Sequence, residues 1–241
     1  MEHPPSPDRF TVPLGGADAV TALAYTDRTA TRVEATLVLG HGAGAGQTSP
    51  FIVSFAAGLA ARGLDVITFN FLYAEQGRRV PDRGPRLEAC YRAVVETTCA
   101  GRPEVAARPL LIGGKSMGGR IASQIAAAPE NDATQTDPAL RVAGLVLLGY
   151  PLHPPGKPDR LRDAHLPRVG VPTLVVQGSR DSFGTPDELR PVLARLAAAR
   201  LYVVEGGDHS LNIRRTSAPP REEIYGMVMD EIIHWVRTVV G

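Results

Sequence analysis

Short apolar runs alternate with longer amphipathic segments along almost the whole chain. The apolar runs predict strands over Ala19–Tyr25, Thr36–Gly40, Asp65–Phe69, Pro109–Gly113, Ala143–Leu148, Thr173–Gln177 and Leu201–Glu205. Several of these runs are apolar throughout, which is typical of parallel strands covered by helices on both faces. Helical periodicity lies between them, near Pro50–Arg62, Arg86–Cys99, Met117–Ala128, Asp187–Ala199 and Glu222–Val239.

This alternation predicts a three-layer α/β fold, with a mostly parallel central sheet and helices on both faces. The "TPDE" run from Thr185 predicts a helix start, because it combines a capping box with a proline at the first helical position. In the last helix Ile224, Val228, Ile232 and Val236 predict one buried stripe. We expect residues 1–241 to form a single domain, in which the irregular segment 149–170 lies over a site as a short lid loop.

Composition limits the classes of protein that fit this pattern. The 241 residues are 44% hydrophobic, which suffices for a well-buried core, and carry a net charge of +1. That charge gives no general electrostatic reason to expect nucleic acid or an anionic membrane as a partner. No apolar run approaches the roughly 20 residues needed to cross a bilayer, and the first ten residues show no secretory signal. Cys90 and Cys99 fall on opposite faces of one predicted helix, so we expect reduced thiols and a cytoplasmic protein.

The stretch "LLIGGKSMGGR" at Leu110–Arg120 fits two kinds of site. A P-loop would need a glycine five residues before the "GKS" glycine, and the residue there is Pro109, which has no N–H to donate to a phosphate. The other frame, Gly114–Gly118, reads G-x-S-x-G between an apolar strand and a helix, as in a nucleophile elbow. Ser116 is therefore the predicted nucleophile. Lys115 becomes incidental, with its charge expected to point toward solvent or a neighbouring loop.

A serine hydroxyl needs a base, and the base needs an orienting acid. After such an elbow, the acid and the histidine are expected in that order, in loops that follow later strands. "QGSRDSFG" supplies Asp181 and "EGGDHS" supplies His209. Asp187 belongs to the capping box, and Asp208 is adjacent to His209, a poor position for reaching the far ring nitrogen. No histidines are spaced as HxH or HExxH, so neither a metal site nor a cofactor is predicted.

An oxyanion hole is the third requirement of this chemistry. One donor is expected from the backbone N–H of Met117, directly after the nucleophile. The glycine-rich loop after Thr36–Gly40 supplies the other, for which we predict Ala43, with Gly44 as the alternative. The same "GAGAG" loop could be a flexible turn, whereas a dinucleotide loop would require G-x-G-x-x-G. His41 is expected to be a hydrogen-bonded scaffold of this loop rather than a second base.

Together, "LGHGAGAG", "GGKSMGGR", "GSRDSFG" and "GGDHS" resemble the α/β-hydrolase superfamily, in that order along the chain. The sequence looks most like a small, capless branch near the dienelactone-hydrolase-like enzymes. That branch shares its domain with a testis-expressed protein and a regulatory subunit of a chromatin acetyltransferase complex. The resemblance implies Ser116 as nucleophile, His209 as base and Asp181 as orienting acid. Dienelactone hydrolases have a cysteine nucleophile instead, so their substrate does not carry over.

Substrate contacts are expected from the glycine loop and from residues that directly follow strands. The predicted substrate-binding residues are His41, Gly42, Gly44, Asn70, Phe71, Tyr73, Tyr150 and His153. The arginines in "GRRVPDRGPR" could attract an anionic substrate, but a solvated loop is the favoured interpretation. The sequence thus predicts a serine hydrolase that acts on a small carboxylic ester through an acyl-enzyme, with a thioester or an amide as less favoured substrates. The alternative is a non-catalytic interaction module that retains the fold.

Overall fold

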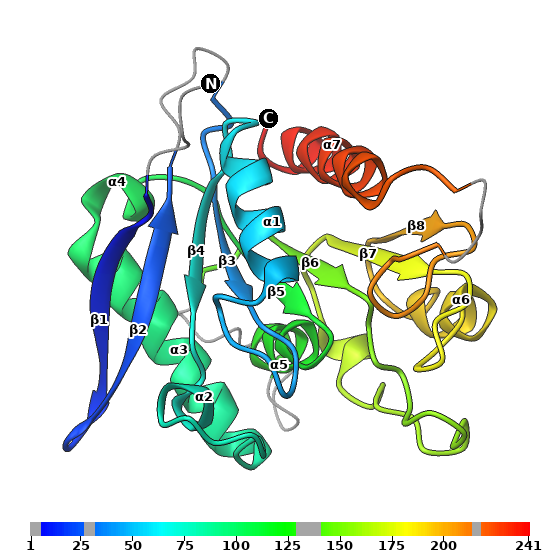
Figure 1. Ribbon diagram of the computed structural model, residues 1–241, viewed down its shortest axis with the longest axis horizontal. Coiled ribbons are helices and arrows are strands. Elements are labelled where there is room, and N and C mark those ends of the chain that lie inside the picture. Colours follow the sequence, from blue (N-terminus) through cyan, green and yellow to red (C-terminus); the bar gives the residue numbers. More distant parts are fainter. Residues whose placement is uncertain (1–5, 27–31, 129–140, 214–217) are drawn as a thin grey trace.

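The computed structural model describes residues 6–26, 32–128, 141–213 and 218–241. Its central sheet has the strand order β1-β2-β4-β3-β5-β6-β7-β8 and twists from β1 at one edge to β8 at the other (Figure 1). The strands are β1 (Asp8–Gly15), β2 (Asp18–Tyr25), β3 (Thr36–Gly40), β4 (Asp65–Phe69), β5 (Leu110–Lys115), β6 (Gly144–Leu148), β7 (Thr173–Gly178) and β8 (Ala199–Val204). The β1–β2 and β2–β4 pairs are antiparallel, and every pair from β4 to β8 is parallel.

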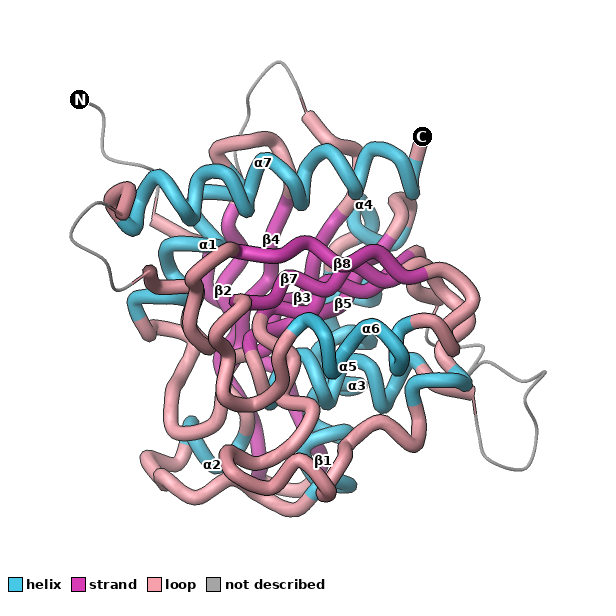
Figure 2. Tube along the Cα trace, turned by 90° about the vertical axis from the view of Figure 1, so that its right-hand side faces the viewer, coloured by secondary structure: helices cyan, strands magenta, loops and turns pink. Residues whose placement is uncertain are grey.

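Helices cover both faces of this sheet. They are α1 (Pro50–Ala60), α2 (Leu72–Glu75), α3 (Gly84–Gly101), α4 (Pro103–Ala106), α5 (Met117–Ala126), α6 (Pro186–Leu193) and α7 (Arg221–Val240), with a short 3-10 helix at Leu166–Arg168. Figure 2 shows α7 on one side of the sheet and α3, α5 and α6 on the other. The fold is therefore the predicted three-layer α/β arrangement with a mostly parallel sheet.

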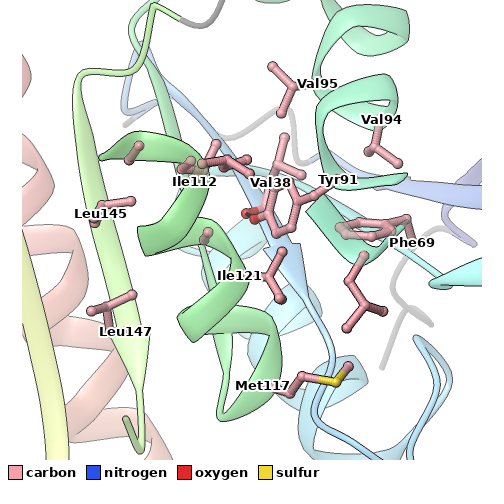
Figure 3. Packing of buried hydrophobic residues seen from close by; sticks show 14 of the residues in the cluster. Val38, Phe69, Tyr91, Val94, Val95, Ile112, Met117, Ile121, Leu145 and Leu147 are labelled. Carbon is pink, nitrogen blue, oxygen red and sulfur yellow. Dashed lines mark hydrogen bonds between the residues drawn. The ribbon is translucent and has the colours of Figure 1, made fainter. Parts of the chain in front are cut away.

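Alternate side chains along each strand are buried in two separate hydrophobic cores, one on each face of the sheet. Leu37 and Leu39 of β3 pack with α1 and α7, whereas Val38 between them packs with α3 and α5. Strand side chains point alternately to the two faces, so an apolar strand contributes to both cores at once. In Figure 3, Ile121 of α5 and Tyr91 of α3 lie among the strand residues of the second core. This double burial explains why the parallel strands read as continuous apolar runs.

Several local predictions are confirmed. The Thr185 hydroxyl accepts a hydrogen bond from the Glu188 N–H, and the Glu188 carboxylate accepts one from the Thr185 N–H, which completes the capping box at the start of α6. The four predicted stripe residues of α7 are all buried. Cys90 and Cys99 are both free thiols on α3.

One strand and one helix end differ from the prediction. The edge strand β1 was not predicted, because Val12 is its only buried residue and Pro13 interrupts it, so it carries little periodic signal. Helix α6 ends at Leu193 rather than Ala199, because Ala199 pairs with Thr173 at the start of β8. Sheet pairing thus overrides the helix propensity of the alanine run.

Within the described ranges, none of the helices combines the length and the apolar character needed to span a membrane.

Candidate active site

Ser116 stands at a sharp turn between β5 and α5. Its backbone has φ 52° and ψ −112°, a conformation that residues other than glycine rarely adopt. Its N–H still donates to the Leu148 carbonyl at 2.9 Å, which anchors the turn to the end of β6. The turn therefore presents the hydroxyl beyond the carboxyl end of the sheet, the edge where sites form in open α/β folds.

Close backbone packing at this turn requires glycine. A Cβ on Gly114 would lie 2.5 Å from the Gly40 carbonyl oxygen and 2.6 Å from the Gly118 carbonyl carbon. A Cβ on Gly118 would collide with the backbone of Gly40 and with the His41 carbonyl. The small residues of "GGKSMGG" thus let β3, β5 and the first turn of α5 approach one another as an elbow requires.

The structure brings together Ser116, His209 and Asp181, as the sequence predicted. His209 Nε2 lies 2.9 Å from Ser116 Oγ, and His209 Nδ1 lies 2.7 Å from Asp181 Oδ2. Because a carboxylate can only accept, the hydrogen-bond network places the imidazole proton on Nδ1 and leaves Nε2 free to accept from the serine hydroxyl. The Phe183 ring stacks on the imidazole, with 4.2 Å between ring centroids.

Asp181 is held rigidly from several directions. Its side chain is fully buried. Oδ1 accepts a hydrogen bond from the Phe183 N–H at 2.8 Å, and Oδ2 accepts one from Gln177 Nε2 at 2.8 Å. Buried Gln177 also bonds to the backbone of Tyr150 and Gly184. The rival Asp208 instead accepts from the N–H groups of Ser210 and Asn212, so it shapes the turn that carries His209.

Lys115, which precedes the nucleophile, contacts the loop of the candidate base. Of the two directions expected for its charge, solvent and a neighbouring loop, the structure shows the second, because the residue is only 7% exposed. Nζ donates to the His209 carbonyl oxygen at 2.6 Å and lies 5.6 Å from the centroid of the Phe51 ring. Burial lowers the pKa of Lys115 to about 8, although the charges of Asp181 and Asp208 act in the opposite direction. The last side chain of β5 thereby ties the nucleophile's strand to the histidine's loop.

The glycine-rich loop after β3 lies beside the candidate nucleophile. A Cβ on Gly42 would be 3.7 Å from Ser116 Cβ, and both Gly42 and Ala43 line the adjoining pocket. His41 is fully buried beneath the loop, where Nδ1 donates to the Gly42 carbonyl at 2.8 Å and Nε2 accepts from the Phe71 N–H at 3.1 Å. Burial lowers the pKa of His41 to about 4. With both ring nitrogens engaged, neutral His41 matches the predicted scaffold better than a second base.

Met117 is the first residue of α5, so its N–H has no acceptor within the helix. Met117 also lines the pocket beside Ser116. The predicted oxyanion donors, the Met117 and Ala43 amides, therefore belong to residues on the walls of one cavity. The alternative donor, Gly44, adopts φ 71° in an exposed turn and does not line that cavity.

The pocket has a volume of about 620 Å³. Its walls are formed by Gly42, Ala43, Ala45, residues 49–52, Pro81, Asp82, Gly84, Leu87, residues 115–117, Arg120, Pro151, Arg162, Phe183, His209 and Ser210. Segment 149–170, predicted as a lid loop, thus contributes Pro151 and Arg162 to a wall.

Most of the predicted substrate-binding residues do not line this pocket. Phe71, Tyr73 and Tyr150 are buried in the core under α3 and α5. Asn70 bonds to the Gln47 N–H and to Glu75, and His153 bonds to Glu188 and the Pro154 carbonyl. Gly42 is the member of the predicted set that faces the cavity. Position after a strand identified the correct edge of the sheet, but side-chain direction at that edge depends on how each loop turns.

Other wall residues were not foreseen. Phe51 sits in the first turn of α1, Leu87 on α3 and Phe183 directly beside the acid's loop. Phe51 stacks on Phe55 and contacts Tyr225, so its position is set by the packing of α1 against α7. The one sequence signal that could have identified Phe183 is its proximity to Asp181, which it follows by two residues.

Comparison with known proteins agrees with this architecture. Residues 33–237 match the family model described as an alpha/beta hydrolase domain. Dienelactone hydrolase from Anabaena variabilis is 20% identical, with a TM-score of 0.71 over 99% of this chain and 100% of that one. An α/β serine hydrolase without a lid from Xanthomonas campestris is 19% identical, with a TM-score of 0.71 over 99% and 97%. A serine hydrolase homologue from Coxiella burnetii is 15% identical, with a TM-score of 0.69 over the whole of both chains. At these identities the structures establish a shared fold, including that of the dienelactone-hydrolase-like branch.

Proposed function

The chain belongs to the alpha/beta hydrolase domain family, and from this membership and the site geometry we propose that it is a serine hydrolase acting on a small carboxylic ester. The observation that carries the proposal is the unbroken hydrogen-bonded chain from Ser116 through His209 to Asp181, at the wall of a pocket. A scaffold would gain nothing from a serine held in a strained turn against a histidine whose proton position is fixed by a buried acid.

In the proposed reaction His209 Nε2 removes the proton of Ser116 Oγ as the oxygen attacks the ester carbonyl. Asp181 stabilises the imidazolium that forms and keeps it oriented. The tetrahedral oxyanion accepts hydrogen bonds from the Met117 and Ala43 amides, each worth about 2.7–4 kcal/mol in comparable sites. His209 then protonates the leaving alcohol, which departs as the acyl-enzyme forms.

Deacylation repeats these steps with water. His209 removes a proton from the water, whose oxygen attacks the acyl carbon, and then returns the proton to Ser116 Oγ as the carboxylic acid departs. All of these steps use groups of the chain, the substrate and water. A thioester would follow the same course with a thiol as leaving group, and an amide would need the same proton delivered to its nitrogen.

Labelling with a fluorophosphonate probe tests the nucleophile directly. We expect stoichiometric modification of Ser116 in the folded wild type and none in Ser116→Ala. Ser123→Ala, a change of the same kind in the middle of α5, is the matched control and should still label at Ser116. Folded wild-type protein that resists the probe would favour the non-catalytic interaction module instead.

Turnover is tested with a short p-nitrophenyl ester. Removing one member of such a triad typically lowers kcat by 10⁴-fold or more, so Ser116→Ala should fall to the uncatalysed background. Equal rates for the wild type and Ser116→Ala would refute the mechanism.

A further inference from the structure

Two arginine side chains line the pocket with Ser116, and neither is neutralised by a carboxylate. Arg120 lies in the first turns of α5, and Arg162 comes from the segment after β6. Both residues are half-buried. Within the described ranges, Arg120 donates to Gln124 Oε1 at 3.3 Å, Arg162 donates to the Pro151 carbonyl at 3.5 Å, and neither is part of an ion pair.

Several other arginines of the described structure form ion pairs with carboxylates. Arg195, Arg200 and Arg108 each pair with a carboxylate at 3.0 Å or less. Asp163, the immediate neighbour of Arg162, bonds to Arg195 rather than to either pocket arginine. Among the described residues, half-buried Arg168 also lacks a carboxylate partner, but it donates to the Ala128 and Ala164 carbonyls and lies outside the pocket. In the pocket, a partly desolvated guanidinium without a counter-charge is costly unless a ligand supplies one.

The two guanidinium groups also act on each other. Burial lowers the pKa of Arg120, and the charge of Arg162 lowers it further, whereas the charge of Glu88 acts in the opposite direction without forming an ion pair. Two cations close enough to repel each other favour the binding of an anion. An anion bound between them offsets the repulsion and accepts hydrogen bonds from both guanidinium groups.

Arg162 is held in place by its own backbone. Its N–H donates to the Leu152 carbonyl at 2.8 Å, and its carbonyl accepts from the buried Tyr150 hydroxyl at 2.7 Å. Arg120 is fixed by α5, which begins directly after the nucleophile. The acidic wall residue Asp82 pairs with Arg78 at 2.8 Å, so its charge is already balanced. The pocket therefore keeps a net positive character at the arginine pair.

We propose that Arg120 and Arg162 form an anion-binding subsite, so that the substrate is an ester which carries a second, negatively charged group, a carboxylate or a phosphate. This inference rests on the proposed function for its catalytic part. The predicted binding of an anionic group does not depend on that function, because the two arginines should bind the group whether or not the ester is cleaved.

Matched esters test the preference. The first pair is the mono-p-nitrophenyl ester of glutaric acid and the p-nitrophenyl ester of its neutral monoamide. The second set is 4-acetoxybenzoate, 4-acetoxybenzamide and 4-acetoxyphenyl phosphate, which places the charge on the alcohol side and separates carboxylate from phosphate. We expect the wild type to prefer an anionic member over its neutral analogue by roughly tenfold or more in kcat/KM.

Arg120→Gln and Arg162→Gln should each reduce that preference to near unity, because kcat/KM falls much further for the anionic ester than for its neutral analogue. Arg160→Gln, in the same segment but exposed and outside the pocket, removes the same charge and should keep the preference. A wild type without any anionic preference, or a preference that survives both pocket substitutions, would overturn the proposal.

Calorimetric titration of Ser116→Ala with the glutarate ester separates the two hypotheses. Binding that Arg120→Gln weakens tenfold or more supports the subsite even if no ester is hydrolysed. Hydrolysis of neutral esters without anionic preference supports the serine hydrolase and overturns the subsite. Thermal unfolding of each arginine variant establishes that a loss of binding is not a loss of folded protein.

Discussion

Replacing Ser116 by glycine and, separately, by alanine tests the strained turn without reference to any substrate. Both changes remove the hydroxyl and its hydrogen bond to His209, so the two variants differ only in the Cβ at φ 52° and ψ −112°. A residue other than glycine in such a sparsely populated region costs about 1–3 kcal/mol. Glycine loses about 0.4–1 kcal/mol relative to alanine through the greater freedom of the unfolded chain.

The difference leaves Ser116→Gly more stable than Ser116→Ala by about 1 kcal/mol, which corresponds to roughly 2–4 °C in Tm for a chain of this size. The sign decides the test, because alanine is the more stable residue at ordinary backbone angles. Ser123, in the interior of the same helix, provides the control. At this position the free energy of unfolding of Ser123→Ala should exceed that of Ser123→Gly by about 1 kcal/mol. Guanidinium unfolding followed by circular dichroism measures all four variants. If Ser116→Ala equals or exceeds Ser116→Gly in stability, the turn is not strained and the argument for an elbow loses its physical basis.

Two further predictions concern buried polar side chains. Burial lowers the pKa of Lys115 from 10.5 to about 8. Between these pH values the unfolded state therefore binds one more proton than the folded state. Because of this difference, Lys115 makes the free energy of unfolding rise with pH across that window. Urea unfolding at pH 7.5, 9 and 10 should show wild type gaining stability relative to Lys115→Met, and a constant difference would contradict the lowered pKa. Tyr91→Phe should lower the free energy of unfolding by about 1–3 kcal/mol, because the hydroxyl lies 2.7 Å from the Val38 and Gly113 carbonyls and 3.0 Å from the Gly113 N–H in the fully buried core. Tyr202→Phe on β8 is the control, expected to change stability by less than about 0.5 kcal/mol, and an equal loss in the two variants would argue against the Tyr91 hydrogen bonds.

The sequence could predict the elements that strong local patterns encode. Parallel strands such as β3 and β6 are buried on both faces, so their apolar runs are continuous and easily recognised. The convergence of Ser116, Asp181 and His209 was predictable because each follows the end of a parallel strand, and those ends share one edge of the sheet.

Side-chain direction beyond the strand ends was not predictable. Phe71 and Tyr73 follow β4 as expected, but the short helix α2 begins between them and both side chains turn into the core. Lys115 reads as a surface residue by type, yet as the last residue of β5 it is buried against the His209 loop. Arg120 and Arg162 line one pocket because α5 and the segment after β6 pack together, a contact that no local pattern encodes.

From β5 onward, the order of strands in the sheet follows the order of synthesis, each new strand joining the edge that the previous one created. Lys115 and Ser116 lie at the end of β5, and their hydrogen bonds to His209 span 94 and 93 residues of chain. On the ribosome, where the N-terminal portion folds first, the serine turn can form well before the histidine has emerged. A stalled or truncated chain would hold the serine without its proton acceptor. Under the proposed mechanism, translation products that stop short of β8 are therefore hydrolytically silent.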